Sequence, residues 1–386
     1  MPLYDLTEFL KLSSVLNYNL SAASLNRYNV LTYITGGKKL DPDDKTDRER
    51  KSLVMDALGY LFNAYRQKRR YLGPMAVLHP LRATALLTRT QDNLNLVDIL
   101  CTLFHDIQED VKPVEFEVHQ WKEMEAQLYH LMERLPEEEE STLAYSLRGL
   151  TRTAQESYYE YIDRLLRYAR QQPSLIQIKL ADRLDNTLDM RIDLQDPLAG
   201  VDFFQDIFQL MFVNNYQGYR PPIDHQYSTA LKGARRLYQL FKNSVLLSLI
   251  RQDEAASGNH AIDVLFNAVC DASLKEAQRT LLHLLGYHVK DLKTQRQLVL
   301  DTMEYCFSGR SDLVTKPEGK HLLDGLFATY FAPTCKGILN QKLDALYQDK
   351  PLMLQASLAF LVIFLSFSND WKYYIRGISA AGIAPS

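Results

Sequence analysis

The chain has 386 residues, of which 46% are hydrophobic and 24% charged, and its formal net charge is −3. A chain of this length and composition can bury a sizeable core, in two domains or one large one, which excludes a disordered or fibrous protein. The slightly negative charge gives no general attraction to nucleic acid, so we expect no nucleic-acid partner and only local phosphate binding.

The cysteines and the N-terminal residues predict a cytoplasmic protein. The four cysteines are widely separated and form no Cys-x-x-Cys pair, as expected of reduced, mostly buried thiols: Cys101, Cys270, Cys306 and Cys335. Residues 1–5 lack the basic start and apolar core of a secretory signal, so we expect no export.

The chain begins with a segment that we expect to be an N-terminal helical extension and linker, residues 1–51. Residues 1–35 are moderately apolar and rich in Asn and Tyr, which favours one or two helices. Residues 36–51 (GGKKLDPDDKTDRERK) combine Gly, Pro and a run of charges, which is typical of an exposed linker or loop. The next predicted domain covers residues 52–199.

Three separated motifs in that domain predict one divalent metal site. They are centred on His79, on the pair His105–Asp106, and on Asp182 at the end of the apolar run 175–180. A carboxylate in a mostly buried helix is costly unless it is paired or bound to a metal. Imidazole and carboxylate ligands together suit manganese, iron or zinc far better than calcium.

Helical spacing extends this prediction to a second acidic pair. The apolar stripe over 97–107 has helical periodicity. Residues four apart share a helix face, which places Glu109 next to His105 and Asp110 next to Asp106. The simpler alternatives are that Asp182 pairs with the following arginine and that the acidic pair is a solvated helix end.

An acidic run at 136–142 (PEEEEST) predicts a solvated loop or the start of a helix.

Basic residues surround these motifs. Arg66, Lys68, Arg69 and Arg70 precede His79, and a solvated helix face is the alternative to a binding role for them. Arg70 is favoured for a phosphate or base contact, because its planar guanidinium offers a fork of donors. Lys179 and Arg183 flank Asp182 and either neutralise developing charge or pair with the acidic cluster.

Residues from about 60 to 196 resemble the HD-type hydrolase domain of the RelA/SpoT alarmone enzymes and their small single-domain relatives. The resemblance runs, in the family's order, through AYRQKRRYLG, HPLRATALL, LFHDIQEDV, LRGLTRT and IQIKLADRLDNT. It implies four protein ligands for a single metal, usually manganese: His79, His105, Asp106 and Asp182. It also implies that Glu109 and Asp110 orient or activate the attacking water.

The resemblance further implies a set of substrate contacts and shows three departures. Arg70 would flank the nucleotide, Asn186 would lie near the ribose, and Arg152 stands where the family has a lysine. GPMAVLH replaces the family's Gly-Glu-Pro-Tyr stretch, Tyr71 replaces a lysine and could stack on the base, and Asp185 replaces a histidine. These departures leave the metal ligands intact and are expected to alter the substrate rim.

The function that follows is metal-dependent removal of the 3′-pyrophosphate from guanosine tetra- or pentaphosphate. One divalent metal per chain is expected, with manganese first and iron or zinc as alternatives. The substrate-binding residues would be Arg70, Tyr71, Arg152, Lys179, Arg183 and Asn186. Two alternatives remain open: an HD-type phosphatase acting on another 2′- or 3′-phosphorylated nucleotide or cofactor, and a non-enzymatic protein that binds an alarmone or a partner.

Residues 200–386 predict a C-terminal helical domain of unknown role. Residues 218–224 predict a turn, 230–250 a helix, and 260–289 two antiparallel helices. The apolar run 351–367 predicts a buried core helix or a homo-oligomer interface, with a membrane tail anchor as the alternative. Strand patterns are nearly absent. The fold class is therefore predicted to be all-α, an HD-type helical bundle with an additional C-terminal helical domain.

Overall fold

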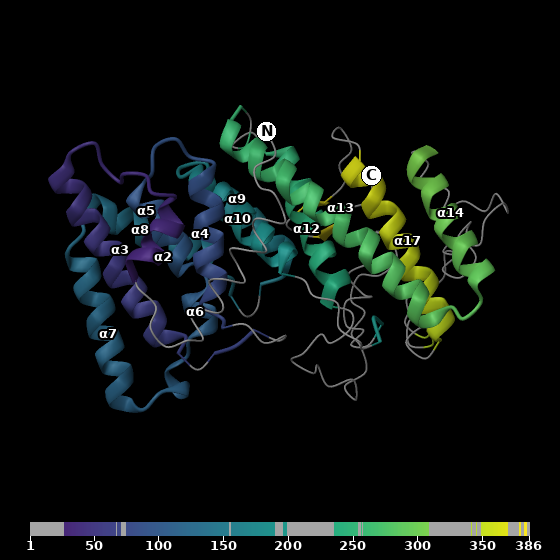
Figure 1. Ribbon diagram of the computed structural model, residues 1–386, viewed down its shortest axis with the longest axis horizontal. Helices are drawn as coiled ribbons and strands as arrows, with labels where there is room; N and C mark the ends of the chain where they lie inside the picture. Colours follow the sequence, from purple (N-terminus) through teal and green to yellow (C-terminus); the bar gives the residue numbers. More distant parts are fainter. Residues whose placement is uncertain are drawn as a thin grey trace. The chain divides into compact units, whose positions relative to one another are not determined.

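The computed structural model describes most of the chain between residues 27 and 383 (Figure 1). The described residues are 27–66, 68–70, 75–153, 156–189, 196–198, 235–253, 256, 258–308, 341, 345, 349–369, 378–379 and 382–383. The N-terminal helices predicted before residue 27, the turn at 218–224 and Tyr71 lie outside them.

The described elements are almost entirely helical, which confirms the predicted all-α class. The exceptions are the 3-10 turn η1 (Pro113–Glu115), one isolated bridge, and the two-residue strands β1 (Ile378–Ser379) and β2 (Gly382–Ile383), which pair antiparallel. The chain divides into two compact units, which we describe separately. The first comprises residues 1–157, 161–189 and 253–269, and the second comprises 158–160, 190–252 and 270–386.

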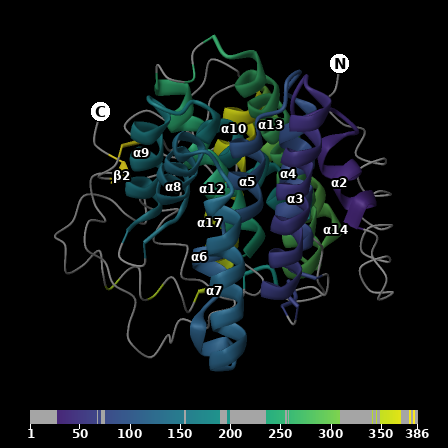
Figure 2. The ribbon, with the colours of Figure 1, turned by 90° about the vertical axis from the view of Figure 1, so that its left-hand side faces the viewer.

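The first unit is a helical bundle built around α4 (Leu78–Arg89), α5 (Leu96–Phe104) and α10 (Ser174–Leu188). Helix α4 packs against α10, α5 and α2 (Arg27–Thr35), and α5 also packs against α3 (Asp44–Ala64) and α8 (Glu137–Leu150). Figure 2 shows α3, α4 and α5 side by side. All nine residues of α5 are buried, so the helix is enclosed along its whole length. The remaining helices are α6 (Ile107–Asp110), α7 (Val118–Glu133) and α9 (Tyr158–Ala169).

The charged segment 36–51 differs from the expected loop in its second half. Helix α3 begins at Asp44, because the Asp43 side chain accepts hydrogen bonds from the backbone N–H groups of Lys45 and Thr46 at 3.1 and 2.8 Å. Asp47 is buried beneath the loop and accepts from the Leu40 N–H at 2.6 Å. The charged residues that suggested a linker therefore form the N-cap and the first turns of a helix.

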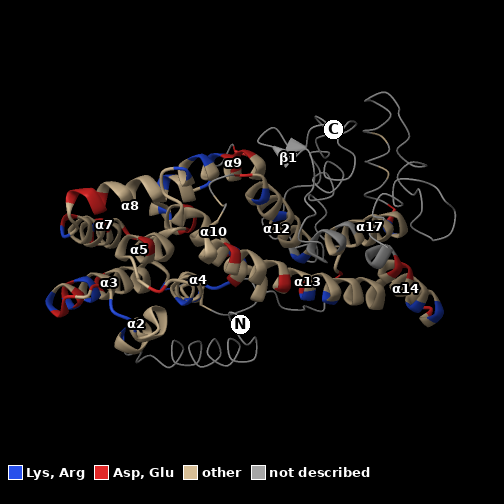
Figure 3. Cartoon of the chain, turned by 90° about the horizontal axis from the view of Figure 1, so that it is seen from above, with Lys and Arg blue, Asp and Glu red and all other residues tan. Residues whose placement is uncertain are grey.

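The acidic run after Pro136 forms the first turn of α8, one of the two predicted alternatives. Residues 137–140 are all glutamate, and Figure 3 shows them in red at the start of this helix. Negative charge at that end complements the partial positive charge of the unpaired backbone N–H groups.

The second unit contains α12 (Arg235–Gln252), α14 (Leu292–Ser308), α17 (Lys350–Asn369) and most of α13 (His260–His288). The prediction of two antiparallel helices over 260–289 is wrong, because α13 runs through that segment without a break. No glycine or proline occurs between residues 260 and 285, so nothing in the sequence interrupts the helix there.

Helix α17 is the buried core helix that the apolar run 351–367 predicted. Side chains along it are fully enclosed, among them Ala356, Leu358 and Phe360, and it packs against α14 and α12. Among the described helices, none combines the length and the apolar character that a membrane crossing needs.

The N-cap of α5 gives a first prediction. Asn95 accepts hydrogen bonds from the N–H groups of Val97 and Asp98 at 2.8 and 3.3 Å. Asn95→Ala should weaken α5 by about 1 kcal/mol, because two backbone donors lose their acceptor. The effect should appear as faster amide hydrogen exchange in peptides that cover α5. Asn93→Ala, at an exposed position two residues away, is the matched control, and equal exchange in the two variants would contradict the capping role.

Candidate metal centre

Four side chains from three parts of the first unit converge on one point. His79 lies in the first turn of α4, where Pro80 is tolerated because the first backbone N–H groups of a helix have no internal partner. His105 and Asp106 lie between α5 and α6, and Asp182 lies in the middle of α10. One ligand atom from each residue lies within 4.8 Å of all the others, so this group could hold a metal ion.

The distances within this group suit one small cation. The Nε2 atom of His79 lies 3.2 Å from Nε2 of His105, 3.2 Å from Oδ2 of Asp106 and 3.1 Å from Oδ1 of Asp182. The Nε2 atom of His105 lies 3.2 and 3.6 Å from the same two carboxylate oxygens. Ligands bound at about 2.0–2.2 Å to one ion are separated by about 3–3.6 Å. The four donors could therefore hold a single metal ion.

A break between two helices makes this convergence possible. The prediction that one helix carries His105 and Asp106 with Glu109 and Asp110 one turn on is wrong, because α5 ends at Phe104 and α6 begins at Ile107. Adjacent residues of a continuous helix point about 100° apart. At the break, Nε2 of His105 and Oδ2 of Asp106 come within 3.2 Å of each other.

Burial and charge act in opposite directions on the two histidines. His79 is 5% exposed and His105 is 2% exposed. Burial and the charge of Arg70 favour the neutral ring of His79, but hydrogen bonds to three aspartates outweigh them and raise its pKa to about 9. Burial of His105 is likewise outweighed, chiefly by the charge of Asp106, so its pKa is well above the usual value. The group is thus rich in negative charge, as a cation site requires.

The two carboxylates of the group stay ionised for the same reason. Burial alone would raise their pKa values. The charge and hydrogen bond of His105 hold the pKa of Asp106 far below its usual range. The charge of Lys179 and the hydrogen bonds of the two histidines do the same to the pKa of Asp182.

Three of the four candidate ligand side chains also have a bonding partner outside the group. The Nδ1 atom of His105 lies 2.7 Å from the carbonyl oxygen of Thr102, and Nδ1 of His79 lies 2.7 Å from Oδ2 of Asp185. With the Nδ1 atoms facing these acceptors, both Nε2 atoms face the centre. On Asp182, Oδ2 lies 2.7 Å from Nζ of Lys179, and Oδ1 accepts from Nδ2 of Asn186 at 2.5 Å.

Asp185 does not lie at the substrate rim, where the sequence placed it. Its side chain is fully buried and is bonded to His79, to Arg82 and to Arg70. Arg82, which is also buried, and Asp189 belong to the same ion-pair network and were not identified from the sequence. Their spacing in the sequence could have indicated this network. Arg82 follows His79 by three residues, and Asp185 follows Asp182 by three. Helical residues three apart lie next to each other on one face of the helix.

The acidic pair beside the four ligands is solvent-exposed. Oε1 of Glu109 accepts from the backbone N–H of Arg152 at 2.6 Å, and Oδ2 of Asp110 accepts from the hydroxyl of Tyr65 at 3.1 Å. Desolvation by the surrounding protein raises the pKa of both carboxyls, and the charge of Asp106 raises them further. Each is therefore a stronger proton acceptor than a carboxylate in water.

Most of the basic side chains that were predicted to bind the substrate form hydrogen bonds or ion pairs within the protein. The Arg70 guanidinium contacts Asp185 and Asp189, each at 3.3 Å, and donates to the Asn186 side chain. The Arg152 guanidinium donates to the carbonyl oxygen of Glu156 at 2.8 and 3.0 Å. Lys179, as described above, pairs with one of the four ligands, and Arg183 is buried.

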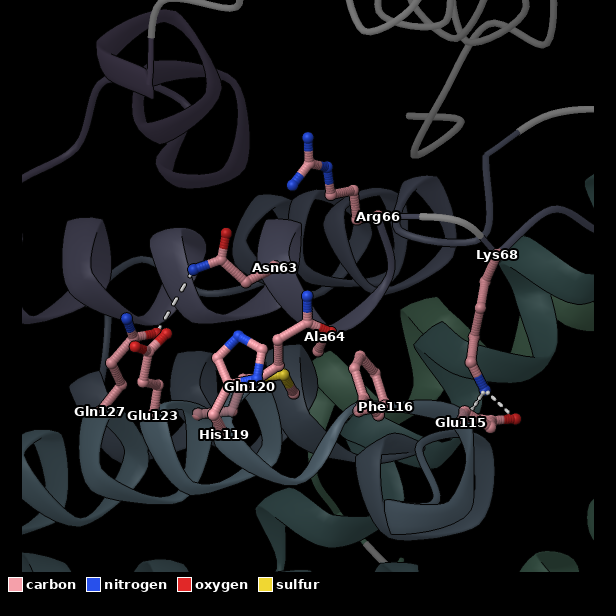
Figure 4. A pocket seen from close by; sticks show the side chains of 11 residues that line it. Asn63, Ala64, Arg66, Lys68, Glu115, Phe116, His119, Gln120, Glu123 and Gln127 are labelled. Carbon is pink, nitrogen blue, oxygen red and sulfur yellow. Dashed lines mark hydrogen bonds and ion pairs between the residues drawn. The ribbon is translucent and has the colours of Figure 1, made fainter.

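A pocket of about 480 Å³ lies between the end of α3 and the start of α7 (Figure 4). Figure 4 shows Lys68 reaching Glu115 at one end, while Asn63 donates to Gln127 at the other. None of the four candidate ligands lines this pocket. Its link to the metal centre is Lys68, whose Nζ also donates to the carbonyl oxygen of Asp110.

Comparisons with protein-family models, with curated proteins and with solved structures find no match for this chain.

The geometry predicts that the chain binds about one divalent metal ion. His105→Gln should abolish high-affinity binding, because it removes one of the four ligands. Titration of the full chain with zinc or manganese against a metal indicator measures both stoichiometry and affinity. His119→Gln, at an exposed histidine outside the group, is the control. Wild-type affinity in His105→Gln would contradict the assignment.

The raised histidine pKa values predict the pH dependence of binding. Metal binding needs neutral imidazole, so the ion must displace the protons held by His79 and His105. Since the pKa of His79 is about 9, apparent affinity should rise with pH up to about that value and fall steadily as pH decreases. Isothermal titration in buffers of different ionisation enthalpy should record proton release. Binding without proton release at pH 7 would contradict this prediction.

Proposed function

We propose that the first unit is a metal-dependent phosphohydrolase of the HD type, similar to the hydrolase domain of the RelA/SpoT enzymes. Its proposed reaction removes the 3′-pyrophosphate from guanosine tetra- or pentaphosphate. The observation that supports it is the convergence of His79, His105, Asp106 and Asp182 within 4.8 Å, beside a second acidic pair that belongs to none of these ligands.

Manganese is the proposed ion, with iron or zinc as alternatives. Two imidazoles and two carboxylates form a mixed nitrogen and oxygen set without thiolates, which suits these ions. The bound ion would supply Lewis-acid polarisation of a phosphoryl oxygen.

Glu109 is the proposed general base. Its carboxylate lies one turn beyond Asp106, and the Arg152 N–H fixes one oxygen at 2.6 Å. Its raised pKa favours uptake of a proton from the attacking water. Asp110, held by the Tyr65 hydroxyl, would orient that water from the neighbouring position.

One observation favours a second candidate, a phosphatase acting on another 2′- or 3′-phosphorylated nucleotide or cofactor. A 3′-diphosphate needs several cations, yet Arg70, Arg152 and Lys179 are each bonded to protein acceptors. A phosphate monoester carries less charge and would need fewer of them. Both candidates share the metal centre and the role of Glu109.

A substrate panel separates the two candidates. With manganese, the full chain should release pyrophosphate from guanosine tetra- and pentaphosphate, which chromatography of the products detects. Release of orthophosphate from 2′- or 3′-phosphorylated nucleotides, without reaction of the guanosine substrates, would favour the second candidate. Absence of turnover on the whole panel by a metal-loaded protein would contradict both and favour a binding role.

Glu109→Gln tests the proposed base. The variant should keep its metal content, because Glu109 lies outside the four ligands, while kcat falls by about two to four orders of magnitude. Metal analysis and turnover are measured on the same preparation. Glu138→Gln, at an exposed position in the first turn of α8, is the control. Parallel loss of metal and activity in Glu109→Gln would make this residue a ligand instead.

A further inference from the structure

We propose that Asp185 is a positioning residue of the metal centre, which holds the His79 ring so that Nε2 faces the ion. This inference rests on the metal binding of the proposed function but not on its substrate. It assigns to Asp185 a role behind the centre, at a position where a contact with substrate was expected.

The contact between Asp185 and His79 has the geometry that this role requires. Oδ2 of Asp185 lies 2.7 Å from Nδ1 of His79, while Nε2 of the same ring lies 3.1 Å from Oδ1 of Asp182. A carboxylate at Nδ1 keeps the proton on that nitrogen, fixes the orientation of the ring and increases the basicity of the other nitrogen. His105 has only a neutral backbone carbonyl in the equivalent position.

Two arginines hold the Asp185 carboxylate in its buried position. Nε of Arg82 donates to Oδ1 at 2.6 Å, and an Nη of Arg82 donates to Oδ2 at 3.1 Å. An Nη of Arg70 lies 3.3 Å from Oδ2. A fully buried carboxylate without such partners would be protonated and could not accept from Nδ1.

The competing explanation is that Asp185 only joins α10 to α4 by an ion pair. A second aspartate of the chain, Asp189, serves as a control for this explanation. Asp189, one turn further on, lies 3.1 Å from Arg82 and 3.3 Å from Arg70. It therefore shares both guanidinium groups with Asp185, and within the described part of the chain it forms no hydrogen bond or ion pair with His79. A structural role would be common to the two aspartates, whereas a positioning role belongs to Asp185 alone.

The experiment compares Asp185→Asn and Asp189→Asn in the full chain by competitive titration with zinc and with manganese. We expect Asp185→Asn to bind each ion about 10- to 100-fold more weakly, the usual effect of removing a partner of a metal-bound histidine. Asp189→Asn should keep wild-type affinity. Both variants should melt at lower temperature, because each removes a carboxylate from the same two arginines.

Wild-type metal affinity in Asp185→Asn would overturn the inference and leave the proposed function standing. Equal losses of affinity in both variants would also overturn it, in favour of the structural role. A wild-type chain that binds neither ion would instead remove the basis of the proposed function itself.

A second measurement needs no variant and covers the case in which Asp185→Asn fails to fold. In the zinc-loaded wild-type chain with 15N-labelled histidine, the ring of His79 should bind zinc through Nε2 and carry a proton on Nδ1 that exchanges slowly with water. Zinc bound through Nδ1 of His79, or an Nδ1 proton on this ring that exchanges as fast as that of an exposed histidine, would overturn the inference.

Discussion

The first unit depends on the burial of two carboxylates of α10, Asp182 and Asp185, against the histidine of α4. Neither carboxylate could remain ionised there alone, since the desolvation of a buried charge costs several kcal/mol. Each has cationic or hydrogen-bonding partners on both sides: Lys179 and the histidines for Asp182, and Arg82 for Asp185. The contact between α4 and α10 is therefore an electrostatic one at its centre, where carboxylate oxygens and imidazole nitrogens face one point that could hold a metal ion.

The break between α5 and α6 determines which atoms reach that point. Helix α5 is buried along its whole length, so its end is fixed by packing. The chain then leaves the helical path at Asp106, whose carbonyl accepts from the N–H groups of Glu109 and Asp110 at 3.0 and 2.8 Å. This short turn directs two neighbouring residues inward and the next acidic pair outward. Two candidate ligands and the proposed proton acceptor are thus separated within six residues of the chain.

Much of this arrangement could be predicted from the sequence, and the failures have physical causes. Helical periodicity gave the all-α class, and the motifs around His79, His105 and Asp182 gave the four residues that converge. The break after Phe104 could not be predicted, because no glycine or proline marks it and tertiary packing decides it. The position of Asp185 was also missed, since a charged residue at this spacing suits a rim or a core equally, and only the packing of α4 brings a buried arginine to it.

The same ion pairs limit how the site can recognise an anion. Arg70 contacts Asp185, which holds His79, and donates to Asn186, which holds Asp182. A phosphate that binds Arg70 must replace these acceptors. The free energy of binding therefore gains only the difference between the new contacts and the lost ones. The contacts that support His79 and Asp182 and the proposed anion contact of Arg70 therefore compete for the same guanidinium group.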